Sequence, residues 1–313
     1  MDNFQTPIKN KLINNVIQIP PSPLMKKIGF GTHVVVYEFE RSPLPEKSRS
    51  PWAIKKLIES HKQQDSAKTA NKRLKAEAEI LRKLNHPNIV GFRACTKQSD
   101  DTCIIAMEGC TSSLGDLIEN RLDYLGDVPF PPNTILKMSS DIVNALDYLH
   151  NEKLLLHGDI KSMNILVKGE FVICKLCDFG VSLPLTKAGE IDKEKAGEDV
   201  EYAGTPHWCA PEVFQDNQII TSKADIYSFG LVIWEMLSLA PPNMSESFEE
   251  SFFDSSIDEK IEPRQRPPLP DVDLEPEYNL VLEIYFCCTI VDFMKRPNAQ
   301  NLVKVFNQIM DKK

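Results

Sequence analysis

The sequence has no uninterrupted apolar run near the roughly 18 residues that are needed to cross a membrane. The longest candidates are Ile226–Trp234 and Ile284–Val291, so a membrane-spanning protein is excluded. The segment Met1–Leu12 also lacks a basic region followed by an apolar stretch and a small-residue cleavage site. We therefore expect no secretory signal and a cytoplasmic or nuclear protein without a membrane partner.

Positive charge is scarce as well. The chain has 36 Lys and Arg against 45 Asp and Glu, a formal net charge of -9. Because nucleic-acid binding depends on neutralising phosphates, we expect no nucleic-acid partner. The 8 cysteines are scattered without the spacing of a disulfide framework and are expected to be thiols. The rest of the composition, 42% hydrophobic and 26% charged, is ordinary for a globular chain.

The first hundred residues predict a small sheet. Residues 1–23 are polar and contain Thr6-Pro7, which indicates a flexible tail. Residues 26–58 alternate short β-branched runs with Gly and Pro, which is typical of an antiparallel meander, with a loop at 41–51. A helix is predicted over 67–84, because apolar residues share one stripe there. Two further strands are expected at Ile89–Ala94 and Cys103–Met107.

The remainder predicts mainly helices. Residues 134–151 place apolar side chains on one helical face, and 224–239 is a largely apolar helix. The acidic stretch 245–262 indicates a solvated insert. The expected class is therefore α+β, with a 24–108 lobe of antiparallel sheet and one major helix, a larger helical lobe over 109–310, and a short tail at 311–313.

Three short motifs are weak evidence by themselves. Gly29-Phe30-Gly31 between two strands could bring backbone amides to phosphates, but such a motif is more often a plain hairpin, and Val34 occupies the place of a usual third glycine. A strand follows it, which argues against a dinucleotide site. Cys174 and Cys177 form a CxxC without a second pair at zinc spacing, so packed thiols are the preferred interpretation.

Stronger evidence comes from charged residues in a fixed order. Lys55 lies on the third expected strand, and Glu77 follows 22 residues later on the expected helix, although either alone would be an ordinary surface charge. The segments His157–Asn164, Asp178–Gly180 and Ala210–Glu212 come next. Four such motifs at these spacings rarely arise by chance.

In these motifs the chain resembles the eukaryotic protein kinases, over about residues 24–310. The resemblance implies the bilobal kinase fold and transfer of the ATP γ-phosphate with Mg²⁺. Lys55 would grip the phosphates while held by Glu77, and Asp159 would be the catalytic base. Other implied roles are Asn164 and Asp178 as magnesium ligands, and Lys161 and Thr205 as marks of a serine/threonine kinase.

The same resemblance implies an adenine pocket between the lobes. Its apolar walls would be Ile28, Val36, Ala53 and Leu166, with Gly29, Phe30 and Gly31 over the phosphates, Met107 as gatekeeper, main-chain contacts at Glu108 and Cys110, and Cys177 at the rear. Two structural roles are also implied. Glu212 and Arg296 would form a buried ion pair, and Asp225 would brace the catalytic loop.

A closer resemblance rests on residues 50–56, 155–164, 180–185 and 221–236, and on Gly158 in the position of the usual arginine before the catalytic aspartate. These segments are similar to mitotic kinases related to the MAP kinase kinases. The resemblance implies protein substrates, acceptance of tyrosine being open, and control by a proline-directed mitotic kinase at Thr6. The end Met310–Lys313 lacks the apolar terminal residue that PDZ domains bind, so PDZ binding is not expected.

Three alternatives follow from the same residues. A pseudokinase scaffold would bind partners without catalysis, although no expected base or metal ligand is missing. Six acidic residues in 190–201 outnumber three lysines at 187–195 and would draw basic substrates to the site, although a solvated loop without a substrate role is the preferred interpretation. Since Gly158 offers no cation to a loop phosphate, phosphorylation between Asp178 and Glu212 is not expected to be a strict on-switch.

Overall fold

The computed structural model describes residues 25–30, 34–39, 52–58, 65–98, 100–197, 200–215, 218–243 and 266–310. The expectations for the tail with Thr6, for Gly31, for the 41–51 loop, for the acidic stretch 245–262 and for the last three residues lie outside these ranges. The described residues form two compact units. The first unit consists of the described residues up to Arg82 together with Phe92–Gly109. The second consists of Lys83–Gly91 and the described residues from Cys110 onward.

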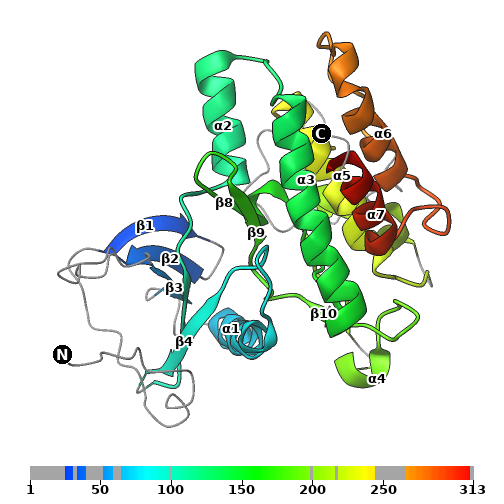
Figure 1. Ribbon diagram of the computed structural model, residues 1–313. Coiled ribbons are helices and arrows are strands. Elements are labelled where there is room, and N and C mark those ends of the chain that lie inside the picture. Colours follow the sequence, from blue (N-terminus) through cyan, green and yellow to red (C-terminus); the bar gives the residue numbers. More distant parts are fainter. Residues whose placement is uncertain are drawn as a thin grey trace, which may run out of the picture. The chain divides into compact units, whose positions relative to one another are not determined.

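The first unit is an antiparallel five-stranded sheet with one long helix (Figure 1). Its strands, in the order in which they pair, are β1 (Met25–Phe30), β2 (Val34–Phe39), β3 (Trp52–Leu57), β5 (Cys103–Glu108) and β4 (Phe92–Lys97). The helix α1 spans Asp65–Lys83 and buries Leu74, Ala78 and Leu81. The antiparallel meander and the helix are therefore confirmed.

One strand prediction was wrong at its start. β4 begins at Phe92, whereas Ile89 makes an isolated bridge to Leu176 and belongs to the second unit. Val90 donates its N–H to the same Leu176 at 2.9 Å. The apolar run from Ile89 thus contains two separate pairings, the bridge to Leu176 and the strand β4, with Gly91 between them.

The two faces of the sheet differ in what they hold. Phe39, Ile54, Ala94 and Ala106 form a buried cluster on one face. Successive strand residues point to opposite faces, so the cross-strand partners Lys55 and Ile105 lie on the other. Lys55 contacts Glu77 of α1 from that side, so this is the face that α1 covers.

The second unit is mainly helical, and α3 and α5 form its centre (Figure 1). Its helices are α2 (Leu114–Leu125), α3 (Pro132–Asp147), α4 (Lys193–Ala196), α5 (Lys223–Ser238), α6 (Asn279–Cys288) and α7 (Ala299–Met310). Its strands are β6 (Ser112–Ser113), β7 (Leu155–Leu156), β8 (Ile165–Lys168), β9 (Ile173–Leu176) and β10 (Leu183–Pro184). Short 3₁₀ turns cover Ser162–Asn164, Pro206–Trp208, Pro211–Phe214 and Pro276–Tyr278. The predicted α+β class is confirmed.

Two helix predictions in this unit are confirmed in position. The predicted 134–151 helix is α3 followed by one π-helical turn, Tyr148–Lys153, which ends where Leu154 adopts a left-handed conformation with φ of 50°. The apolar residues that predicted it are fully buried: Ile135, Met138, Ile142, Ala145 and Leu149. α5 is buried along its whole length from Ala224 to Leu237. Among the described helices, none is long and apolar enough to cross a membrane.

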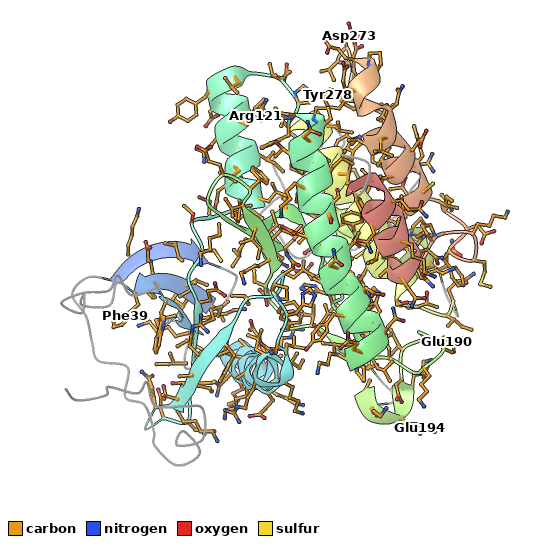
Figure 2. All side chains as sticks on the ribbon, viewed as in Figure 1. Phe39, Arg121, Glu190, Glu194, Asp273 and Tyr278 are labelled. Atoms are coloured by element: carbon orange, nitrogen blue, oxygen red, sulfur yellow. The ribbon has the colours of Figure 1, made fainter. Side chains whose placement is uncertain are left out.

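Side chains also fasten the connection between α2 and α3 (Figure 2). Arg121 donates from Nε to the Val128 carbonyl and from Nη2 to the Pro129 carbonyl, at 2.7 Å each. Tyr278 donates its hydroxyl to the Phe130 carbonyl at 3.1 Å. These bonds satisfy three carbonyls of an irregular segment and hold the end of α2 beside the start of α3.

Candidate active site

In the first unit, the lysine and glutamate singled out in the sequence form an ion pair. Lys55 Nζ lies 2.8 Å from Glu77 Oε2, with side chains 8% and 2% exposed. The backbone of Lys55 is fixed in β3, where it pairs with Val36 of β2 on one side and with Ile105 of β5 on the other. Removing one partner of such a pair would leave a buried charge unpaired, which is strongly destabilising. The pair therefore ties α1 to the sheet.

In the second unit, a buried carboxylate holds the start of the loop His157–Asn164. Asp225 of α5 accepts the backbone N–H groups of His157 and Gly158 at 2.9 Å each, and His150 Nε2 lies 2.8 Å away. Burial alone would raise the Asp225 pKa, but these hydrogen bonds and the nearby histidines hold it below its usual value. Asp225 is therefore ionised and fixes the backbone that precedes Asp159.

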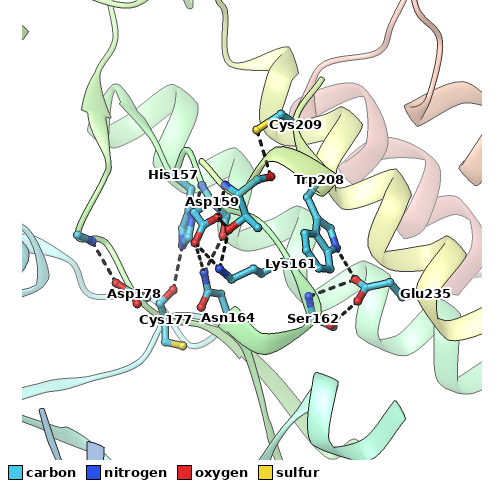
Figure 3. Close-up of polar contacts among 12 residues, drawn as sticks. His157, Asp159, Lys161, Ser162, Asn164, Cys177, Asp178, Trp208, Cys209 and Glu235 are labelled. Carbon is cyan, nitrogen blue, oxygen red and sulfur yellow. Dashed lines mark hydrogen bonds and ion pairs between the residues drawn. The ribbon is translucent and has the colours of Figure 1, made fainter. Parts of the chain in front are cut away.

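Four donors surround the Asp159 carboxylate (Figure 3). Thr205 donates its N–H to Oδ1 at 2.9 Å and its hydroxyl to the same oxygen at 2.6 Å. Asn164 Nδ2 donates to Oδ2 at 2.9 Å, and Lys161 Nζ lies 2.9 Å from that oxygen. Lys161 also donates to the Thr205 hydroxyl at 2.7 Å. The structure thus brings together Asp159, Lys161, Asn164 and Thr205.

Backbone contacts of the neighbouring Cys177 place Asp178 beside Asn164 and His157. Cys177 donates its N–H to the Asn164 carbonyl at 3.0 Å, and His157 Nε2 lies 3.0 Å from the Cys177 carbonyl. The fully buried Phe179 ring packs on the His157 ring with centroids 4.9 Å apart. Asp178 itself has a φ of 63°, a left-handed conformation that aspartate tolerates better than most residues. These contacts hold the Asp178 segment against the loop His157–Asn164.

A second buried ion pair anchors the segment after Thr205. Arg296 donates from Nη1 and Nη2 to the two Glu212 carboxylate oxygens, at 2.7 Å and 3.0 Å. Arg296 also bonds the carbonyls of Ile290 and Lys223. The bidentate geometry and the extra acceptors satisfy a guanidinium that is only 1% exposed. The pair foreseen in the sequence is present.

The segment between Asp178 and Thr205 is folded onto the second unit. β10 pairs with β7, and Leu185 bridges Ile191. A buried cluster of Leu156, Leu183 and Leu185 is covered by partly buried apolar side chains: Leu154, Ile191, Val200, Tyr202 and Ile220. Strand pairing and apolar burial therefore hold the described part of this segment.

Sequence reasoning missed a cavity of about 630 Å³ next to Lys161 and Thr205. Glu235 of α5 lies in its wall and accepts hydrogen bonds from the Ser162 hydroxyl at 2.5 Å and from Trp208 Nε1 at 2.8 Å (Figure 3). Burial nevertheless raises the Glu235 pKa to about 7. A glutamate within the otherwise apolar run of α5 was the available signal.

The residues expected to bind adenine are divided between the units. In the first, Ile28 and Gly29 lie on β1, Val36 on β2, Ala53 on β3, and Met107 and Glu108 on β5; Phe30 ends β1. In the second, Leu166 lies on β8, Cys110 precedes β6, and Cys177 follows β9. Ala53 pairs directly with Met107. Burial raises the pKa of Cys174 on β9 to about 12 and keeps it a thiol.

The sequence matches the protein kinase domain family over residues 23–306. The chain belongs to the protein kinase family. It is 42% identical to the human lymphokine-activated killer T-cell-originated protein kinase, over 97% of both chains. This match confirms that the closer resemblance found in the sequence is to this kinase. This chain is also 31% identical to the Arabidopsis thaliana serine/threonine/tyrosine-protein kinase HT1, over 80% of this chain and 58% of that kinase.

A third relative is the Caenorhabditis elegans mitogen-activated protein kinase kinase kinase zak-1, 30% identical over 69% of this chain and 26% of that one. The chain thus spans nearly the whole human kinase but only part of the other two. What these relatives share with this chain is the kinase domain.

Proposed function

We propose that the chain is an active serine/threonine protein kinase that transfers the γ-phosphate of ATP to protein hydroxyls. The observation that supports this best is the Asp159 carboxylate with its Lys161, Asn164 and Thr205 donors. Phosphoryl transfer depends almost entirely on positioning and on charge stabilisation, and these residues supply both.

Asp159 is the proposed base. Its donors fix the carboxylate plane, so that the substrate hydroxyl is oriented when it approaches and its proton passes to a carboxylate oxygen. Lys161 is held between Asp159 and Thr205 by bonds of 2.9 Å and 2.7 Å, which keeps a positive charge beside the reacting oxygen. Thr205 connects the base to the segment that would position the substrate.

The residues fit ATP and Mg²⁺. Asn164 directs its amide nitrogen at Asp159, so its oxygen Oδ1 faces the other way. That oxygen and the Asp178 carboxylate are the hard donors that Mg²⁺ prefers, and Mg²⁺ commonly takes only one or two protein ligands beside phosphates and water. Within the described ranges no cluster of three or more His, Cys, Asp or Glu could hold a metal by itself. Bound Mg-ATP would supply the phosphoryl group and its charge neutralisation, and Lys55 would contact the phosphates in the first unit.

Basic proteins are the proposed substrates. Glu119 lines the 630 Å³ cavity beside Lys161, together with apolar residues of α2. Glu190, Glu194 and Glu201 are exposed in or near the segment that follows Asp178, and Figure 2 labels the first two. Acidic groups around a site raise the local concentration of basic partners. A peptide array would show preference for Lys and Arg, and preference for acidic peptides would reject this specificity.

The mitotic role is proposed from the sequence resemblance to mitotic kinases alone. A proline-directed mitotic kinase would then modify Thr6, in the Thr6-Pro7 dipeptide. Phosphate mapping in mitotic and interphase cells tests this, and a bare Thr6 in both would refute it. The proposed location is the cytoplasm or the nucleus.

The enzyme is tested against a non-catalytic scaffold by incubating the purified chain with labelled ATP, Mg²⁺ and a basic protein. We expect label in the protein, as phosphoserine and phosphothreonine after acid hydrolysis. Label in phosphotyrosine as well would make the enzyme dual-specific. No transfer, with ATP binding intact, would favour the pseudokinase scaffold.

A further inference from the structure

Two cysteine sulfurs lie very close together in the first unit. Cys95 on β4 and Cys103 on β5 have their Sγ atoms 3.0 Å apart. Cys95 pairs with Ile105, and Lys97 pairs with Cys103, so the two cysteines are diagonal neighbours on one face of an antiparallel ladder. A disulfide has its sulfurs about 2.05 Å apart. The thiols therefore need to approach by only about 1 Å to form a bond.

The surroundings divide the two thiols into an attacking and a resolving sulfur. Cys103 is 1% exposed, whereas Cys95 is half-buried and open to a small solute. The hydrogen bond from Cys103 lowers the Cys95 pKa to about 7, and Arg82 and Lys97 act in the same direction against Glu79 and burial. The same contact and burial raise the Cys103 pKa. The lowered pKa favours the thiolate of Cys95, which is the reactive form.

We propose that Cys95 and Cys103 form a peroxide-sensitive pair that closes to a reversible disulfide between β4 and β5. The Cys95 thiolate attacks one oxygen of a hydroperoxide, giving a sulfenic acid and releasing hydroxide or alkoxide. The Cys103 sulfur then attacks the Cys95 sulfur, the S–S bond forms, and the sulfenic oxygen leaves as water with the Cys103 proton. The peroxide is reduced by two electrons, and the two thiols are oxidised by two.

The pair also touches the helix that carries Glu77. Cys103 donates its backbone N–H to Asn71 Oδ1 at 2.9 Å, and Asn71 Nδ2 donates to the Asp101 carbonyl at 3.1 Å. Lys75 Nζ lies 2.5 Å from the Asp101 carboxylate. The β4–β5 turn is thus hydrogen-bonded to α1 at Cys103, one of the two residues that would be oxidised. The pair therefore lies next to the hydrogen bonds that join this turn to α1.

The test is peptide mapping without reductant after brief treatment of the folded chain with hydrogen peroxide. Trypsin cleavage after Arg93, Lys97 and Arg121 separates the two cysteines into fragments 94–97 and 98–121. We expect these fragments to be disulfide-linked, with the link assigned to Cys103 rather than Cys110 by fragmentation, and to separate after dithiothreitol. Absence of the link, or a link to Cys110, would overturn the proposal.

Two variants and a control sharpen the result. Cys103→Ser removes the resolving sulfur but keeps a hydrogen-bond donor beside Cys95, so Cys95 should be trapped by dimedone as a sulfenic acid, several-fold more than in the unsubstituted chain. Cys95→Ala should give neither link nor adduct in fragment 94–97. Cys287→Ala, which removes the exposed thiol on α6, should leave the link unchanged. Equal dimedone labelling of Cys95 with and without Cys103 would contradict the resolving role, and circular dichroism confirms that each variant is folded.

Discussion

Gly158 donates its backbone N–H to the Asp225 carboxylate at 2.9 Å, with a φ of 81°. A side chain at this position would bring Cβ to 3.2 Å from the Val181 carbonyl oxygen. The glycine therefore serves both a left-handed turn and a close backbone approach. The loop backbone therefore requires glycine at the position where related kinases commonly have an arginine.

Asp225→Asn should loosen this loop. The amide keeps one acceptor but presents an N–H₂ group to donors, so a buried bond is lost and the free energy of unfolding falls by about 1–3 kcal/mol. Phosphate transfer should fall with it, because the backbone before Asp159 is no longer fixed. Urea denaturation and turnover measure the two effects. Asp273→Asn, at an exposed position, is the control and should change neither.

Gly158→Ala should lower stability by about 1–2 kcal/mol through its positive φ, and by more through the contact with Val181. Gly126→Ala separates the two causes, since Gly126 has a φ of 67° and no atom within 4 Å of an added Cβ. We expect the larger loss at Gly158 in thermal denaturation. Equal losses at both glycines would show that the approach to Val181 costs nothing.

The buried Glu235 predicts a pH dependence of stability. Its pKa is raised from 4.5 to about 7 in the folded chain, mainly by burial. The folded state therefore holds this proton more tightly, and the stabilisation is present below about pH 4.5 and lost as the pH rises toward 7. Glu235→Gln cannot lose a proton, so its stability relative to the unsubstituted chain should rise between pH 5 and pH 8, by up to roughly 3 kcal/mol.

Denaturation by urea at pH 5, 6, 7 and 8 measures that difference. Glu283→Gln, at an exposed position on α6, should show no such trend. A Glu235→Gln difference that is constant across the four pH values would mean that Glu235 is ionised throughout.

Removal of phosphate from the segment after Asp178 should leave substantial turnover. Tyr202 packs on the Leu156, Leu183 and Leu185 cluster, and the Thr205 hydroxyl is bound by Lys161 and Asp159. These contacts involve no phosphate. Phosphatase treatment, with mass spectrometry to confirm that Thr186, Tyr202 and Thr205 are bare, followed by a turnover assay, tests this. Complete loss of activity that returns on rephosphorylation of one residue would contradict it.

The sequence predicts those parts that depend on local periodicity and on ordered motifs. α1, α3 and α5 follow from their apolar stripes, and the Lys55–Glu77 and Glu212–Arg296 pairs follow from the family motifs. The start of β4 does not, because the Ile89 bridge to Leu176 depends on a residue 87 positions away. A continuous apolar run carries no signal for where one pairing ends and another begins.

The Cys95–Cys103 and Glu235 contacts were also beyond the sequence. The first depends on strand register, since a shift of one residue would send the two sulfurs to opposite faces. The second depends on Ser162 and Trp208 converging on one turn of α5 from two separate loops. Spacing along the chain encodes neither arrangement.

Phosphate transfer by Asp159→Asn, compared with Asp178→Asn and the unsubstituted chain, tests the proposed catalysis most directly. Asp159→Asn removes the proton acceptor, so transfer should fall by ~10²–10⁴-fold while Mg-ATP still binds with unchanged affinity. Asp178→Asn should instead weaken Mg-ATP binding, because it removes a proposed metal ligand. Wild-type turnover in purified Asp159→Asn would contradict the assignment of this carboxylate as the base.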